Sequence, residues 1–414
     1  MRIQKSRGTR DLLPEEMRRF RIIEGAFRDI CLKWGYQEIR TPTIEYLHLF
    51  TSTGTLTPGT LSKVYSFLDW DGWSGERVVL RPDGTIPVAR LYIDNLSKEK
   101  LARLFYVTNI FSFEETGKED REKWQCGAEL IGAGSPTADI ELLTIALETL
   151  KNLGVREPKL KLSHAGLIRA LLAGFGLSVE EQGKVFDQIL DGDMAVLAQL
   201  KDEKPDLLHL LNPLLELKGE SSGFLKNLKA VFDRTLPEFT PALDNFISVT
   251  DTLTAMGQKY EIDIGSGRGF EYYTGVIFQL LARDVKVAGG GRYDALIPLL
   301  GGKNIPASGF ALYVDKLMNL VKPPRSVAEK FIVTVQDEHP KTVKAAFDAI
   351  TRLHNAGYIA SLKSDDGPTT GITWRLEIRS KQPRFTLISP AGKGRHEDTS
   401  IEAVLKHLGG RGEY

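Results

Sequence analysis

The stretch from Phe105 to Gly132 constrains the fold of this chain more than any other. It opens with an apolar, aromatic run that is typical of a buried strand. A charged segment from Glu114 to Lys123 contains a glycine and indicates a hairpin loop. A second strand is predicted from Trp124 to Ile131, and its apolar run is interrupted by Gln125 and Glu129. Because side chains alternate along a strand, these two residues, four positions apart, lie on the same face.

The shared face of Gln125 and Glu129 has two interpretations. An amide and a carboxylate are accepted in a core only when each has a partner, because burying an unpaired polar group costs free energy. The face is therefore either exposed to solvent or the floor of a site for a small cationic or amino-bearing ligand. The residues alone leave both interpretations open.

Charge and cysteine content exclude several classes of protein. The chain has 414 residues, which predicts two or three domains, and its Lys+Arg and Asp+Glu counts are equal at 54, so bulk charge does not indicate a polyanion partner. Cys31 and Cys126 lie in apolar patterns and are predicted to be core residues. The seven histidines form no spaced pair, so no metal or cofactor is expected. The lack of an 18-residue apolar run and of a signal sequence predicts a cytoplasmic protein with no membrane contact.

The chain divides into a large and a small part. Strands and helices mix as far as residue 321, except that apolar residues follow helical spacing between about 177 and 253, which predicts a helical insertion. The sequence Lys-Pro-Pro-Arg at 322–325 predicts a linker. Beyond it, strands and helices alternate through residues 326–414, which predicts a small α/β domain.

Further motifs lie between the insertion and the linker. Three glycines, Gly289 to Gly291, follow a predicted strand and would let a ligand or another strand approach the backbone closely. Arg268 stands between two glycines, either as a positioned cation or in a surface loop. Tyr272 and Tyr273 lie on opposite faces of a predicted strand, and core packing is the simpler interpretation for each. Residues 309–320 are predicted to form a helix.

Six motifs in this order are similar to those of the histidyl-tRNA synthetase lineage of class II synthetases. They are RGTRDLLP at 7–14, EIRTPTIE at 38–45, LRPDGTIPVAR at 80–90, the hairpin at 105–132, RGFEYYTG at 268–275 and GGGRYDALIPLLGG at 289–302. The resemblance covers about residues 5–320. It implies an α+β fold in which helices flank an antiparallel sheet, with the helical insertion and a homodimer formed through the segment that contains Thr41-Pro42. Residues 326–414 resemble an anticodon-binding domain only loosely.

The lineage has two branches with different functions. The synthetase activates histidine with ATP and charges tRNA. Its paralogue, the regulatory subunit of ATP phosphoribosyltransferase, lacks aminoacylation activity and partners a short-form catalytic subunit in the first step of histidine biosynthesis, where histidine exerts feedback control. The small domain carries 13 Lys+Arg against 11 Asp+Glu, a net charge of +2 that is too weak to predict tRNA as a partner.

The nucleotide site that the resemblance implies is degenerate. Ser112 stands where the synthetase has an arginine for the α-phosphate, and Lys316 stands where a second arginine packs on adenine. Tyr313 replaces a glycine near the nucleotide. A hydroxyl cannot replace a bidentate guanidinium, and the loss of one such donor typically costs ~10²–10³-fold in rate. The predicted degenerate site comprises Ser112, Arg121 and Lys316.

The histidine pocket, in contrast, is largely retained. The residues that match the family pattern are Asp83 (the synthetase has a longer Glu), Thr85, Gln125, Glu129, Arg268, Tyr272 and Tyr273. Two carboxylates and an amide suit the amino group of free histidine, and Arg268 suits its carboxylate. The resemblance therefore favours a non-catalytic regulatory subunit that binds free histidine. The alternatives are a divergent histidine–tRNA ligase and a binding module with another partner.

Overall fold

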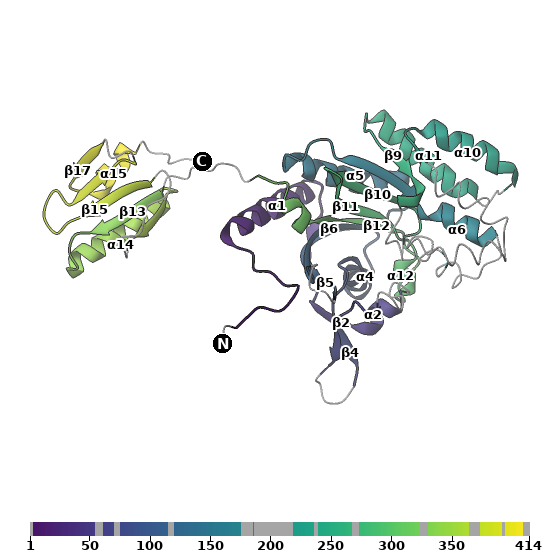
Figure 1. Cartoon of the computed structure of the whole chain (residues 1–414), viewed down its shortest axis with the longest axis horizontal. Helices are drawn as coiled ribbons and strands as arrows, with labels where there is room; N and C mark the ends of the chain where they lie inside the picture. The colour runs from purple at the N-terminus through teal and green to yellow at the C-terminus, as the bar shows by residue number, and fades with distance from the viewer. Residues whose placement is uncertain are drawn as a thin grey trace. The chain divides into compact units, whose positions relative to one another are not determined.

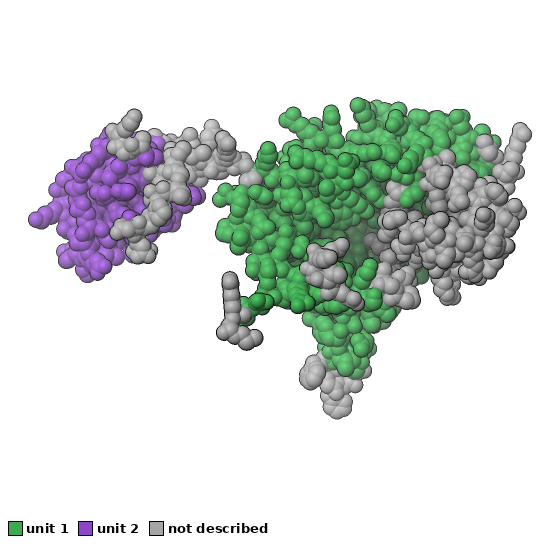
Figure 2. All heavy atoms as spheres, viewed as in Figure 1, with its two compact units in different colours: residues 1–322 green, residues 323–414 purple. Residues whose placement is uncertain are grey.

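The computed structural model describes residues 3–53, 61–69, 75–114, 120–174, 185, 218–235, 239–266, 273–322, 330–363, 373–390 and 394–408. The chain forms two compact units, residues 1–322 and residues 323–414 (Figure 2). Each unit has its own buried core. Among the described helices, none combines the length and the hydropathy that a bilayer-spanning segment requires.

The first unit is organised around a sheet that has nine strands in the described residues. In spatial order they are β1 (Gln37–Glu38), β5 (Ala102–Phe111), β6 (Glu122–Ile131), β12 (Ala307–Tyr313), β11 (Val285–Arg292), β10 (Val276–Ala282), β7 (Lys159–His164), β9 (Glu261–Asp263) and β8 (Lys218–Gly219). Every pairing from β5 through β7 is antiparallel, whereas β1 pairs with β5 and β7 pairs with β9 in parallel.

Helices cover both faces of this sheet (Figure 1). Residues of α1 (Pro14–Lys33), α5 (Pro136–Asn152), α11 (Thr240–Ala255) and α13 (Val314–Met318) belong to the core on one face. Residues of α2 (Leu47–Thr51), α4 (Thr85–Leu91) and α12 (Leu296–Leu299) belong to the core on the other, where a π-helical turn at Tyr92–Leu96 continues α4. The remaining described elements of the unit are α6 (Ala165–Gly174), α10 (Ser222–Thr235), a 3₁₀ turn at Ile264–Ser266 and a small sheet of β2 (Ile44–Tyr46), β4 (Arg77–Leu80) and β3 (Ser66–Leu68).

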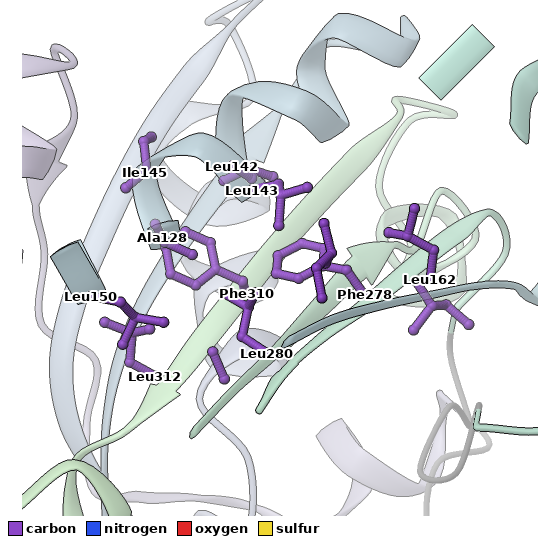
Figure 3. Close-up of a cluster of buried hydrophobic side chains, with 14 of the residues drawn as sticks. Ala128, Leu142, Leu143, Ile145, Leu150, Leu162, Phe278, Leu280, Phe310 and Leu312 are labelled. Atoms are coloured by element: carbon purple, nitrogen blue, oxygen red, sulfur yellow. The ribbon is translucent and has the colours of Figure 1, made fainter. Parts of the chain in front are cut away.

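Alternation along the central strands separates a dry face from a face that carries polar groups. On the dry face, Ala128, Phe310 and Phe278 pack beneath α5, as Figure 3 shows for this cluster. On the other face, the register places Gly309 opposite Glu129 and Gly291 opposite Gly309. Because Gly309 and Gly291 have no side chain, the middle of this face leaves room for long polar side chains from the neighbouring strands.

Four predictions about the first unit were wrong. Tyr273 does not lie in a strand, because β10 begins only at Val276. Residues 309–320 are not one helix, because β12 continues to Tyr313 and α13 covers only Val314–Met318. The glycines at 289–291 lie inside β11 rather than after it, where Gly290 gives room to Phe310 on the next strand. The interpretation of an exposed face at Glu129 fails, because this side chain is 0% exposed.

The predicted helical insertion is only partly described. Helices α10 and α11 lie in it and pack against each other. The short strand β8 also lies in it, although the sequence carried no strand signal there. Most of the residues between 175 and 217 lie outside the described ranges.

The second unit is a sheet covered by two neighbouring helices. Its strands, in spatial order, are β14 (Ile359–Leu362), β13 (Lys330–Val335), β15 (Thr373–Ile378), β16 (Phe385–Ile388) and β17 (Arg395–Asp398). Helices α14 (Pro340–Asn355) and α15 (Ile401–His407) contact each other and the sheet. The sequence did not predict β17, which is charged and mostly exposed at the sheet edge.

Candidate functional site

The candidate site is centred on Glu129, in the middle of β6. Its Oε1 accepts hydrogen bonds from Thr85 Oγ1 at 2.8 Å and from the Tyr106 hydroxyl at 3.2 Å. Its Oε2 accepts a short hydrogen bond from the Tyr293 hydroxyl. A Cβ at Gly309 would overlap Oε2, so the glycine on β12 is what allows the carboxyl to lie across the sheet. Four separate segments of the chain thus meet at one buried carboxyl group.

Burial controls the charge of this carboxyl group. The pKa of Glu129 is raised from 4.5 to about 8, mainly by desolvation and in smaller part by the nearby Asp83. The hydroxyls of Tyr293, Thr85 and Tyr106 act in the opposite direction, because their hydrogen bonds stabilise the carboxylate. Without a cationic ligand, Glu129 is therefore mainly protonated at pH 7.

Asp83 lies beside this group at the start of α4. Its Oδ1 accepts a hydrogen bond from the backbone N–H of Ile86 at 2.7 Å, which satisfies a free donor of the first helical turn. Burial raises the pKa of Asp83, and hydrogen bonds from the backbone N–H groups of the same turn lower it. The sequence Pro-Asp-Gly-Thr thus places a second carboxyl near Glu129 and directs Thr85 toward it.

The other predicted histidine-binding residues are placed in part. Gln125 lies on the same face as Glu129, between Thr108 and Tyr313, is half-buried, and makes no side-chain hydrogen bond within the described ranges. The ring of Tyr273 lies over Gly291, where a Cβ would be 3.0 Å from it. Arg268 and Tyr272 lie outside the described residues. The structure therefore brings Asp83, Thr85, Gln125, Glu129 and Tyr273 to one sheet face.

On the side predicted for the nucleotide, Arg121 is held by its own hairpin. Its Nε donates to the carbonyl oxygen of Glu114 at 2.8 Å, and its guanidinium lies 4.7 Å from the ring centroid of Phe113. The backbone N–H of Ser112 donates to the carbonyl oxygen of Arg121 at 2.9 Å and closes the hairpin. The guanidinium thus already has partners within the chain.

Residues of the other motif predicted for the nucleotide, around Lys316, also make contacts within the protein. Lys316 lies exposed on α13, whereas its neighbour Asp315 accepts from the backbone N–H of Trp124 at 2.6 Å and pairs with Arg10. Tyr313 extends across the sheet, and its hydroxyl lies 3.2 Å from the Cβ position of Gly289. Burial raises the pKa of Tyr313 to about 12. Its ring therefore takes up space on the face where the resemblance implies only a glycine.

Sequence reasoning missed two hydroxyl donors of the site, Tyr106 and Tyr293. Tyr106 belongs to the apolar run of the first hairpin strand, and Tyr293 follows the glycine cluster. The alternation of side chains along a strand puts Tyr106 on one face of it, but the strand register that brings its hydroxyl to Glu129 is not visible in one sequence. Within the described ranges, no group of three or more His, Cys, Asp and Glu side chains suits a metal ion.

Comparisons with known proteins define the class. The family model of histidyl-tRNA synthetase matches residues 8–317, and the chain belongs to this family. Two solved structures share its fold. The crystal structure of an ATP phosphoribosyltransferase regulatory subunit/histidyl-tRNA synthetase from Bacillus halodurans gives a TM-score of 0.74 at 24% identity, over 92% of this chain and 98% of that chain. The apo histidyl-tRNA synthetase of S. aureus gives a TM-score of 0.66 at 22% identity, over 98% of this chain and 99% of that chain. The class II synthetase-like fold is confirmed.

Curated relatives show to which of the two branches of the family the chain belongs. The chain is 51% identical to the ATP phosphoribosyltransferase regulatory subunit of Dehalococcoides mccartyi strain BAV1. The 382 aligned residues cover 92% of each chain. It is 34% identical to the histidine–tRNA ligase of Methanocaldococcus jannaschii, over 87% of this chain and 86% of the ligase. Within its family, the chain is an ATP phosphoribosyltransferase regulatory subunit of histidine biosynthesis, as the sequence predicted.

Proposed function

We propose that this regulatory subunit senses free histidine through the sheet face around Glu129 and performs no catalysis itself. One observation carries the proposal. The fully buried carboxyl of Glu129 is held by three hydroxyls beside a second carboxyl, whereas Arg121, predicted for the nucleotide, is bonded to its own hairpin and Lys316 is exposed. Such a buried carboxyl recognises a ligand that brings its own positive charge.

The chemistry of Glu129 suits an amino-acid ligand. A buried acid with a raised pKa gains a partner when a cation binds, because the cation stabilises its ionised form. Gln125 lies on the same face with its amide free of protein partners in the described ranges, and an amide can both donate and accept. Glu129 and Asp83 are the proposed partners of the ligand's positive charge, with Thr85 and Tyr273 beside them.

The same face is poorly suited to activating the ligand with ATP. Adenylyl transfer depends on fixed positive charge at the phosphate oxygens. Here the guanidinium of Arg121 is bonded to the carbonyl of Glu114, and Lys316 is exposed on α13. Ser112 supplies no charge. The chain therefore retains recognition of the amino acid without the means to adenylate it.

The proposed partner is a short-form catalytic subunit of ATP phosphoribosyltransferase, in a cytoplasmic complex in which this chain is a homodimer. The relatives named as regulatory subunits support this partner, since a regulatory subunit implies a catalytic one. The unit of residues 323–414 is proposed to be a degenerate anticodon-binding-like domain that now serves subunit contact. Free histidine is the proposed effector, and tRNA is not a proposed partner.

Reconstitution tests this function. The purified chain is mixed with a short-form catalytic subunit, and formation of phosphoribosyl-ATP is measured with and without histidine. We expect activity that depends on both chains and is inhibited by histidine. In parallel, histidine-dependent ATP–pyrophosphate exchange is measured with the chain alone, and no exchange is expected. Exchange by the chain alone would assign it to the ligases, which it also resembles.

A further inference from the structure

A bulge in the central sheet turns one lysine toward the candidate site. The pairing of β10 with β11 shifts between Leu280 and Leu281, so that Leu281 pairs with Lys286 and Leu280 with Ala288. Val287, the extra residue, is buried in the dry core together with Ala288. A bulge re-aims the side chains next to it. Here it directs Lys286 to the face that carries Tyr313 and the glycines.

Contacts on that face define where the ammonium group lies. A Cβ at Gly289 would be 3.3 Å from Lys286 Nζ and 3.2 Å from the Tyr313 hydroxyl. The Nζ atom is 5.8 Å from the ring centroid of Tyr313. The ammonium therefore lies over the middle of β11 beside a phenol hydroxyl, rather than at the end of an extended side chain in solvent.

The ammonium group has no acidic partner in the described part of the chain. Lys286 is half-buried, and it makes neither an ion pair nor a hydrogen bond with a described residue. Burial lowers its pKa, and no carboxylate among the described residues acts to raise it. Partly buried lysines that keep their charge ordinarily have a counter-ion, because an unpaired buried charge is costly.

The two glycines over which the Glu129 carboxyl and the Lys286 ammonium lie are spaced to suit a small zwitterion between these groups. Oε2 of Glu129 lies over Gly309, and Lys286 Nζ lies over Gly289. Gly309 pairs with Gly291, so Gly289 is its diagonal neighbour on β11, roughly 7–8 Å away. Two hydrogen bonds of about 2.8–3.0 Å each leave a span that the ammonium and carboxylate of one amino acid can fill.

We propose that Lys286 binds the carboxylate of the ligand whose positive charge Glu129 receives, with the Tyr313 hydroxyl as a second donor. The proposal rests on the proposed function and adds a specificity-determining residue to it. The chemistry recognised is an anionic oxygen group. A nucleotide phosphate is the other source of such a group, and the test separates the two.

The test compares histidine with histidinol, which keeps the ammonium and imidazole groups and lacks the carboxylate. Binding of each to the full chain is measured by calorimetry for wild type, Lys286→Met, Lys286→Arg and the control Lys303→Met, an exposed lysine. We expect Lys286→Met to weaken histidine binding by roughly 10- to 100-fold, as for a lost charged hydrogen bond, and to leave histidinol unchanged. Lys286→Arg should keep much of the preference for histidine, and Lys303→Met should match wild type.

Each other outcome has a definite meaning. Equal weakening of histidine and histidinol by Lys286→Met would overturn the proposal, since it would indicate a structural role. Unchanged histidine binding would overturn it as well. If AMP binds the wild type and only AMP binding falls in Lys286→Met, the lysine serves a phosphate and the carboxylate assignment is wrong. If wild type binds no histidine at all, the proposed function itself fails.

Discussion

The raised pKa of Glu129 predicts that Glu129→Gln stabilises the ligand-free chain at alkaline pH. The folded chain holds the proton up to about pH 8, whereas the unfolded chain releases it near 4.5. Between these values the native state binds more protons than the unfolded state, so stability falls as pH rises. The glutamine variant has no proton to lose and should escape this effect.

The magnitude follows from the two pKa values. A difference between 4.5 and about 8 corresponds to about 5 kcal/mol when the group is fully ionised in both states. Integration over pH gives a cost of about 1 kcal/mol at pH 5 and about 5 kcal/mol at pH 9. The stability of Glu129→Gln relative to wild type should therefore increase by about 4 kcal/mol over this range.

Denaturant unfolding of both proteins at pH 5, 7 and 9 measures this difference, with Glu220→Gln as the control. Glu220 is exposed, and its substitution removes one surface carboxyl without changing the buried site. A difference between Glu129→Gln and wild type that stays constant from pH 5 to pH 9 would refute the reasoning. It would mean that the three hydroxyls keep the buried carboxylate ionised despite its desolvation.

Three further substitutions test other parts of the account. Gly309→Ala places a methyl group on Glu129 Oε2 and should abolish histidine binding in calorimetry while the far-UV circular dichroism spectrum is retained; normal affinity would contradict the position of this carboxyl. Asp139→Asn breaks the buried pair with Arg292, whose Nη2 is 2.8 Å from Asp139 Oδ1, and should lower the free energy of unfolding by about 3 kcal/mol; a loss below ~1 kcal/mol would show that the backbone carbonyls of Ala133 and Ser135, to which Arg292 also donates, suffice to hold its charge. Ser112→Arg should produce no ATP–pyrophosphate exchange; exchange in this single variant would mean that the rest of the nucleotide site is intact.

Much of the fold was visible in the sequence because its strands and helices carry strong patterns. The hairpin from β5 to β6 has an apolar run on each side of a charged segment, and α5 has a clear amphipathic repeat. The strand β12 was missed for a physical reason. Its site face carries Ala307, Gly309 and Ala311, so no polar residue alternates with Phe310 and Leu312, and the apolar spacing of α13 extended the predicted helix backward.

The candidate site was predictable only as far as motifs define it. Asp83, Thr85 and Glu129 belong to motifs and meet in the structure. Tyr293 belongs to the motif at 289–302, but the motif alone does not show that its hydroxyl faces Glu129, and Lys286 reaches the site through a bulge that no local pattern encodes. Which hydroxyl faces which carboxylate is decided by pairings between strands far apart in the sequence.

The central claim is that histidine acts on the complex through this chain. It is tested most directly by the histidine dose–response of the reconstituted ATP phosphoribosyltransferase with either wild-type chain or Gln125→Ala. Gln125 contacts no described side chain by a hydrogen bond, so its truncation should leave assembly and uninhibited activity unchanged. The account predicts that the histidine concentration for half-inhibition rises by roughly 10-fold, as for the loss of hydrogen bonds to a charged ligand. Superimposable inhibition curves would contradict it and place the histidine site elsewhere.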